Sequence, residues 1–197
     1  WGDDTAHSTF TSTSADYKSE RHTYASSGDY VVSIGVISGS FSLQSSTNNI
    51  STLFTNGNTS ETSPDIGYLC TVRKIEIGDN VTSIEASAFH YCHSLSQITI
   101  PNGVTSIKSN AFYYCTSLSR ITIPNGVRSI ESNAFYCCVS LGYIKFVSQT
   151  PPTVSSSNAW ANVPTDCKIL VPRGRLSTYR SATNYPSSST YTYEEYD

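Results

Sequence analysis

A period of 23 residues runs through the middle of the chain and constrains its fold more than any other feature. Three successive units share one template and begin at Ile75, Ile98 and Ile121, and a fourth unit, beginning at Ile144, stretches to 25 residues. Aligned apolar positions form the columns Ile75/Ile98/Ile121/Ile144, Ile77/Ile100/Ile123/Phe146, Val81/Val104/Val127, Ile84/Ile107/Ile130/Val154 and Phe89/Phe112/Phe135/Trp160. A unit of this size cannot bury its own apolar side chains, whereas stacked units share one continuous core. The repeat therefore predicts a solenoid, in which each unit is one coil.

Each coil carries its own local signals. The Ile-x-Ile tripeptide predicts a short strand with both isoleucines pointing inward, and Val-x-x-Ile is expected to form the second side of the coil. The pairs Asn102-Gly103 and Asn125-Gly126 predict a tight turn with positive φ, a role that Asn80 can fill in the first coil. The Ala-Phe segment is followed by Cys and Leu at intervals of three residues, which predicts a short helical turn.

The unit ITIPNGVTSIKSNAFYYCTSLSR and its two neighbours resemble the BspA-type leucine-rich repeats of bacterial surface proteins. The pattern of that family is close to I-x-I-P-x-x-V-T-S-I-x-x-x-A-F-x-x-C-x-S-L, and the resemblance extends from Ile75 to about Val171. It implies a leucine-rich-repeat right-handed solenoid, a β-rich α/β fold of short parallel strands and short helical turns. It also implies a last strand at Ile169–Pro172 and a secreted or cell-surface bacterial protein, often argued to be an adhesin, without catalytic activity in the repeat.

Composition divides the rest of the chain. Residues 1–27 are polar and predicted to be irregular, and residues 28–70 are predicted to form a β cap and a loop. Within them, residues 31–43 predict a hairpin or two short strands over the first coil. The repeats are expected at residues 71–171, after an incomplete coil that begins near Pro64. Residues 172–197 are expected to form a C-terminal capping coil or tail, in which residues 185–197 are either a final cap strand or a linker into the next domain.

Charge and polarity exclude several classes of partner. The net charge is −3, and the 12 Lys and Arg residues are scattered, which argues against nucleic acid as a partner. The longest apolar run, from Val31 to Ile37, is too short for a membrane span. The 35 serines and 23 threonines favour a secreted or cell-surface location. The chain begins with Trp1 and contains no methionine, so we expect any signal peptide to have been removed.

Three of the six cysteines, Cys92, Cys115 and Cys138, occupy one position of the repeat. Side chains in register on neighbouring coils run parallel instead of facing each other, so we expect small buried apolar residues and not disulfides or metal ligands. Cys137 is expected to point outward, and the redox states of Cys70, Cys137 and Cys167 are left open. The absence of C-x-x-C spacing argues against zinc.

Signals for catalysis are weak. His90 and His93 are three residues apart, the one hint of a metal site, but they lack an acidic or cysteine ligand at a matching offset and are interpreted as surface histidines. No G-x-S-x-G, Walker loop or H-E-x-x-H occurs. We therefore expect no enzyme, no metal and no cofactor.

The outward columns of the coils are the candidate binding surfaces, because solenoids bind through surfaces. The strand face carries Glu76, Gln97, Thr99, Arg120, Thr122, Tyr143 and Lys145, and the outer aromatic columns carry Tyr91, Tyr113, Tyr114 and Tyr136. Exposed tyrosine is enriched at recognition surfaces. Two further ladders, Glu85/Lys108/Glu131 and Asn110/Asn133/Asn158, are expected to hold neighbouring coils in register.

The sequence favours a monomeric, non-catalytic adhesion or macromolecule-binding module on a cell surface or in the medium. Its expected partner is an extracellular protein or glycan of a host or neighbouring cell. Two alternatives stay open: a structural spacer that presents another domain, and a glycan-binding module suggested by the exposed tyrosines.

Overall fold

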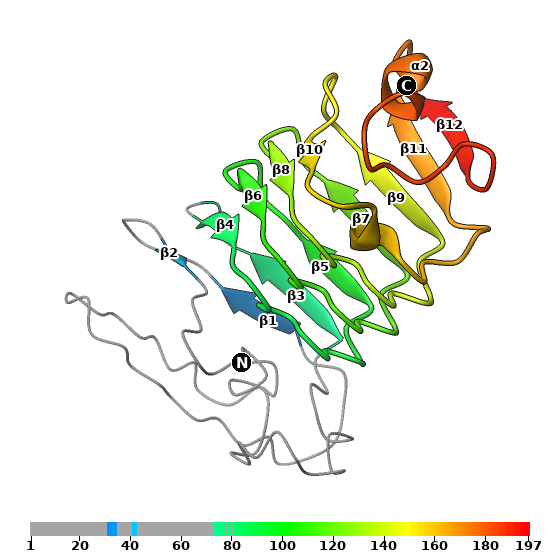
Figure 1. Cartoon of the computed structure of the whole chain (residues 1–197). Coiled ribbons are helices and arrows are strands. Elements are labelled where there is room, and N and C mark those ends of the chain that lie inside the picture. The colour runs from blue at the N-terminus through cyan, green and yellow to red at the C-terminus, as the bar shows by residue number, and fades with distance from the viewer. Residues whose placement is uncertain (1–30, 35–40, 43–72, 78, 80) are drawn as a thin grey trace, which may run out of the picture.

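The computed structural model describes residues 31–34, 41–42, 73–77, 79 and 81–197. Short parallel strands follow one another along the stack, two to each coil, and form two sheet faces (Figure 1). This is the solenoid that the 23-residue period predicts. The expectations for residues 1–27, for the loop beyond residue 43 and for the incomplete coil near Pro64 lie outside the described residues.

The Ile-x-Ile strands form the first face. In the coils these strands are β3 (Lys74–Ile77), β5 (Gln97–Thr99), β7 (Arg120–Ile123) and β9 (Tyr143–Phe146). β3 pairs in parallel with β5, and β7 with β9, with equivalent residues opposite each other, for example Ile75 with Ile98 and Ile121 with Ile144. The isoleucines are buried and the residues between them are half-buried or exposed, so the predicted alternation is confirmed.

The Val-x-x-Ile segments form the second face. It consists of β4 (Val81–Ile84), β6 (Ser106–Ile107), β8 (Ser129–Ile130) and β10 (Thr153–Val154). Ile84 lies opposite Ile107, which lies opposite Ile130, and the three side chains are fully buried. Each residue pairs with the residue at the same position of the next coil because the repeat length is constant.

The Ala-Phe segments close each coil through successive turns. Within the first coil, the amides of Ala88 and Cys92 donate to the carbonyls three residues earlier, while the amide of Phe89 donates to Ala111 of the next coil at 2.7 Å. The expected helical turn is therefore a run of turns in the first three coils. Regular helix appears only in the fourth, as the 3-10 helix η2 (Ser157–Trp160). The segment thus adds a third line of hydrogen bonds between coils.

The Asn-Gly turns differ from the prediction. Neither Asn102-Gly103 nor Asn125-Gly126 has positive φ, so that prediction was wrong. A Cβ atom on Gly103 would lie 2.7 Å from the carbonyl oxygen of Asp79, and one on Gly126 would overlap the carbonyl oxygen of Asn102. Glycine is required here because neighbouring coils approach each other closely, not because the turn is left-handed. Asn80 lies outside the described residues.

The core contains a stack of aromatic rings along the solenoid axis. The ring centroids of Phe89, Phe112, Phe135 and Trp160 follow one another at 5.2, 5.3 and 5.3 Å, with nearly parallel planes. Such offset stacks add to the stabilisation from burial. The predicted column is therefore confirmed as the centre of the fold.

The repeated cysteines pack beside this stack. Cys92, Cys115 and Cys138 are thiols that form no disulfide, and they are fully buried, as predicted. The thiols of Cys115 and Cys138 donate to the carbonyl oxygens of Phe89 and Phe112 in the preceding coils, at 3.1 and 3.2 Å. Burial raises the pKa of Cys138, which keeps the thiol protonated and unreactive.

At the N-terminal end, β1 (Val31–Ile34) pairs with β3, and β2 (Phe41–Ser42) pairs with β4, both in parallel. The two segments belong to different sheets, so of the two alternatives the pair of short strands is correct and the hairpin is wrong. Val32 lies opposite Ile75, and Ile34 lies opposite Ile77. The two strands therefore occupy the places of a coil that precedes β3.

At the C-terminal end, β11 (Lys168–Pro172) is followed by helix α2 (Leu176–Arg180) and by β12 (Thr192–Tyr196), which pairs in parallel with β11. The strand at Ile169–Pro172 is therefore not the last one, because the tyrosine-rich tail returns and adds β12 to the same sheet (Figure 1). The carboxylate of Glu195 holds this arrangement by accepting from the amides of Gly174 and Leu176, at 3.0 and 3.2 Å.

Tyrosine hydroxyls attach this C-terminal segment to the last coil. Four of them donate to backbone carbonyls of that coil at 2.7 to 2.9 Å: Tyr179 to Ser148, Tyr185 to Pro152, Tyr191 to Val163 and Tyr196 to Phe146. Tyr193 donates within the C-terminal segment, to Pro186 at 2.8 Å. Burial raises the pKa of Tyr193 to about 12 and shifts those of Tyr179 and Tyr185 in the same direction. At the end of the solenoid, tyrosine side chains therefore replace the repeat pattern and cap the last coil.

Candidate binding surfaces

The strand face is crossed by contacts between its own side chains. Lys74 Nζ lies 2.6 Å from Glu76 Oε1, and Lys168 Nζ lies 2.9 Å from Glu194 Oε1 on the capping strand. Lys145 Nζ lies 3.8 Å from the centre of the Tyr196 ring, a cation–π contact. Several charges predicted to face a ligand are therefore engaged within the molecule.

The remaining predicted residues of this face lie near its middle. Thr99, Arg120 and Thr122 are exposed, while Gln97 and Tyr143 are half-buried. Parallel pairing places Arg120 opposite Tyr143 and Thr122 opposite Lys145. The structure thus brings the strand-face residues together as one flat, polar surface, in the columns that the repeat predicts.

The turn side of the first three coils carries a cluster of six rings, which we call the aromatic array: His90, Tyr91, His93, Tyr113, Tyr114 and Tyr136. His90, Tyr113 and Tyr136 stack from coil to coil, with centroids 4.8 and 4.9 Å apart and interplanar angles of 26° and 10°. Tyr91 and Tyr114 form a second column at 5.3 Å. All six residues are half-buried, chiefly because each ring covers its neighbours.

The backbone of the turns sets the second column of this array. Tyr91 and Tyr114 have φ of 60° and 57°, and their amides donate across to Tyr113 and Tyr136, each at 2.8 Å. A left-handed tyrosine is uncommon, so sequence reasoning had no signal for it. The same left-handed conformation occurs at Asn110 and Asn133, where asparagine favours it.

Cys137 continues the column of Tyr91 and Tyr114, but it does not point outward. It is only 8% exposed, and its Sγ accepts from the side-chain amide of Asn162 at 3.2 Å. A hydrogen bond with Cys137 also raises the pKa of Tyr114 to about 12. The prediction that this thiol points outward was wrong, because the next coil covers the sulfur.

The aromatic array lies on a side of the solenoid without formal side-chain charge. Residues 86–96, 109–119 and 132–142 include no Asp, Glu, Lys or Arg, although these four residue types make up 14% of the chain. Desolvation lowers the pKa of His90, with a further contribution from His93, and lowers that of His93 as well. Both imidazoles are therefore neutral at pH 7, and the array is an uncharged surface.

The two histidines belong to this array and are not isolated surface residues. His90 stacks on Tyr113, and His93 Nδ1 lies 3.2 Å from Thr116 Oγ1 of the next coil. Among the described residues, no group of three or more His, Cys, Asp or Glu side chains is arranged to hold a metal ion. No helix in the described part of the chain has the length and apolar composition needed to span a membrane.

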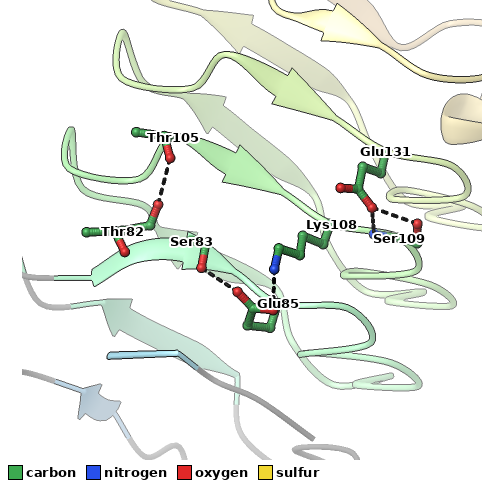
Figure 2. Close-up of polar contacts among 7 residues, drawn as sticks. All are labelled: Thr82, Ser83, Glu85, Thr105, Lys108, Ser109 and Glu131. Atoms are coloured by element: carbon green, nitrogen blue, oxygen red, sulfur yellow. Dashed lines mark hydrogen bonds and ion pairs between the residues drawn. The ribbon is translucent and has the colours of Figure 1, made fainter. Parts of the chain in front are cut away.

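The charge ladder is only partly formed (Figure 2). Lys108 Nζ lies 2.6 Å from Glu85 Oε2, and Glu85 also accepts from Ser83 Oγ at 2.5 Å. Glu131, however, accepts from the amide and hydroxyl of Ser109, at 3.0 and 2.9 Å. Glu85 is buried, so its contact with Lys108 is not the exposed ion pair that was expected.

The amide ladder likewise joins two coils. Asn133 Nδ2 donates to Asn110 Oδ1 at 3.2 Å, so these side chains bond to each other and not to the backbone of the neighbouring coil. Asn158 is exposed at the start of η2, where the fourth coil departs from the template. The contacts within both ladders therefore hold neighbouring coils in register. The strand face and the aromatic array remain as the two candidate binding surfaces.

The stacked parallel coils define a repeat protein of the solenoid class. A family model described as the BspA type leucine rich repeat region, in six copies, matches residues 63–165, more than half of the chain. The chain belongs to the BspA-type leucine-rich repeat family. No curated protein matches it.

Solved structures share the fold. A leucine-rich cell-surface protein from Faecalibacterium prausnitzii aligns with 81% of this chain at 22% identity and a TM-score of 0.53. The pneumococcal vaccine antigen PcpA aligns with 64% of it at 16% identity and a TM-score of 0.50. A leucine-rich repeat protein from Bacteroides ovatus aligns with 64% at 25% identity and a TM-score of 0.48. The aligned regions cover 39%, 36% and 30% of those chains, respectively.

Proposed function

We propose that this chain is a non-catalytic module of a bacterial surface or secreted protein, which binds an extracellular macromolecule through the aromatic array. The family supports this location, as do two structural neighbours, a cell-surface protein and a vaccine antigen. The single observation that carries the binding role is the continuous half-buried cluster of rings across three coils.

The internal contacts of the strand face favour the array over that face. Lysines at both ends of the strand face contact Glu76, Glu194 or the Tyr196 ring, and a ligand would have to compete with these contacts. The hydroxyls of Tyr91, Tyr113 and Tyr136, by contrast, make no hydrogen bond with the described residues. Tyrosine with an available hydroxyl is the kind of residue that concentrates binding energy at interfaces.

The test compares two double variants of the isolated chain on arrays of extracellular-matrix proteins and glycans. Tyr113→Ala/Tyr136→Ala removes the centre of the array, and Arg120→Glu/Lys145→Glu reverses charge on the strand face. We expect saturable binding that the first pair weakens and the second pair leaves unchanged, with thermal melting to confirm folding. Loss of binding only in the charge-reversal variant would overturn the assignment to the array.

The alternative of a structural spacer is decided by the same experiment. A spacer holds another domain at a distance and needs no ligand-facing surface. The absence of saturable binding to every probe by the folded wild-type chain would overturn the binding proposal in favour of the spacer.

A further inference from the structure

We propose that the ligand of the aromatic array is a neutral polysaccharide, laid along the solenoid axis so that successive sugar residues contact successive coils. This inference rests on the proposed function and adds the chemistry of the ligand. It follows from three properties of the array: its lack of charge, its repeat distance and the state of its hydroxyl groups.

The lack of charge narrows the class of ligand. Nucleic acids and sulfated or uronic-acid polymers are bound largely through Lys and Arg, which are absent from residues 86–96, 109–119 and 132–142. A charged partner protein would likewise find no complementary charge on this surface to orient it. A neutral polyhydroxylated polymer needs neither basic residues nor complementary charges. It is therefore the class of ligand that fits an uncharged, hydroxyl-bearing surface.

The repeat distance favours a polymer. The rings of His90, Tyr113 and Tyr136 recur every 4.8 to 4.9 Å, and Tyr91 and Tyr114 recur at 5.3 Å. One pyranose unit of an extended glycan advances by a comparable length, so each coil can repeat the same contact. An extended polypeptide advances about 3.3 Å per residue and does not match coil by coil. Repeated weak contacts along one chain also add in affinity.

The hydroxyl groups show how such a ligand would be held. Because Tyr113 and Tyr136 stack face to face, at an interplanar angle of 10°, each covers a face of the other, and their hydroxyls make no hydrogen bond with the described residues. Each phenol both donates and accepts a hydrogen bond, as sugar hydroxyls do. Recognition should therefore depend on the phenol oxygens and not only on the ring faces, so phenylalanine should not replace tyrosine here.

The experiment measures the binding of wild-type chain and two variants to soluble polymers by isothermal titration calorimetry. The probes are dextran, mannan, xylan and a mixed-linkage β-glucan, with heparin as the anionic comparison. We expect at least one neutral polymer to bind, and Tyr113→Phe/Tyr136→Phe to weaken it about tenfold or more, from two lost hydrogen bonds. The matched control Tyr143→Phe, a half-buried tyrosine of the strand face, should change affinity by less than about twofold. Affinity should also rise with oligosaccharide length until the ligand spans three coils.

Several outcomes would overturn the inference. These are failure of all neutral polymers to bind, stronger binding of heparin, or equal affinity in wild type and Tyr113→Phe/Tyr136→Phe. Binding of a matrix protein that is lost in Tyr113→Ala/Tyr136→Ala would then retain the array as the site and reject only the glycan. Protein binding that no array variant affects would reject both this inference and the proposed function.

Discussion

The repeated coils and the C-terminal cap use the same residue, tyrosine, in opposite ways. In the cap, four tyrosine hydroxyls donate to backbone carbonyls of the last coil, and a fifth, that of Tyr193, donates to a carbonyl within the tail. In the coils, Tyr113 and Tyr136 stack on their neighbours, and their hydroxyls have no such partner among the described residues. The tyrosine hydroxyls of the cap are therefore bonded within the molecule, whereas those of Tyr113 and Tyr136 make no hydrogen bond with the described residues.

The largest effect is expected in the core of the repeated coils. Phe112 is fully buried between the rings of Phe89 and Phe135, so Phe112→Ala removes contacts in two directions and leaves a cavity. We expect a loss of about 3–5 kcal/mol in the free energy of unfolding, measured by denaturant titration. Tyr113→Ala, at the next position but on the surface, is the control, with a loss of less than about 1 kcal/mol. Similar losses for the two would contradict the stacked core.

Alanine substitutions at glycines test why the coils and the cap need this residue. Gly126→Ala would force a Cβ atom into the carbonyl oxygen of Asn102 in the preceding coil, so we expect a loss of about 1–3 kcal/mol. Gly174 of the cap has open space around it but φ of 74°, so Gly174→Ala should cost about 1 kcal/mol.

Gly142 is the matched control among the glycines. A Cβ atom there would lie 3.5 Å from the carbonyl oxygen of Ser119, an ordinary contact, so Gly142→Ala should be nearly neutral. Melting temperatures of the three variants give the order directly. A neutral Gly126→Ala would contradict the close approach of the coils.

The tyrosine hydroxyls give a smaller contrast. Tyr185→Phe leaves the carbonyl of Pro152 without its buried donor and should cost about 1–2 kcal/mol in unfolding free energy. Tyr136→Phe removes a hydroxyl that faces outward and should be neutral to within about 0.5 kcal/mol. Equal costs for the two substitutions would remove the distinction between structural and available tyrosines.

The smallest effect is a dependence of stability on pH that belongs to the coils. Burial lowers the pKa of His90 below 6.5, so the unfolded chain binds a proton more readily than the folded chain. Its contribution to stability is complete above pH 6.5 and is lost as the pH falls through the lower folded-state value. His90→Gln should reduce this slope in urea titrations between pH 7 and pH 5. An unchanged slope would contradict the burial of the imidazole in the stack.

The repeat predicts the fold well because every coil presents the same apolar positions to its neighbours. The strands, the phenylalanine column and the buried cysteines all follow from columns that can be read from Ile75 onward. The errors arise where backbone geometry between coils decides. Glycine in the Asn-Gly turns is required by the short distance to the preceding coil. Among the described residues, the left-handed positions of the first three coils are instead Ser87, Tyr91, Asn110, Tyr114, Asn133 and Cys137.

The ends were harder to predict because they contain no second copy with which to align them. The capping role of the tail from Tyr185 to Asp197 becomes visible only from the contacts of Tyr191 and Tyr196 with the last coil. For the candidate site, the tyrosine columns were visible in the sequence. The inclusion of His90 and His93, and the exclusion of Cys137, needed the three-dimensional packing of the turns.

Hydroxyl-radical footprinting with mass spectrometry, with and without the bound polymer, tests the central claim most directly. Binding of the polymer at the aromatic array predicts that oxidation of Tyr113 and Tyr136 is strong in the free chain and falls when the polymer binds. It also predicts that Tyr179 and Tyr185, buried in the cap, are modified weakly in both states. Protection confined to Tyr143 and its neighbours on the strand face, with Tyr113 and Tyr136 unchanged, would contradict it.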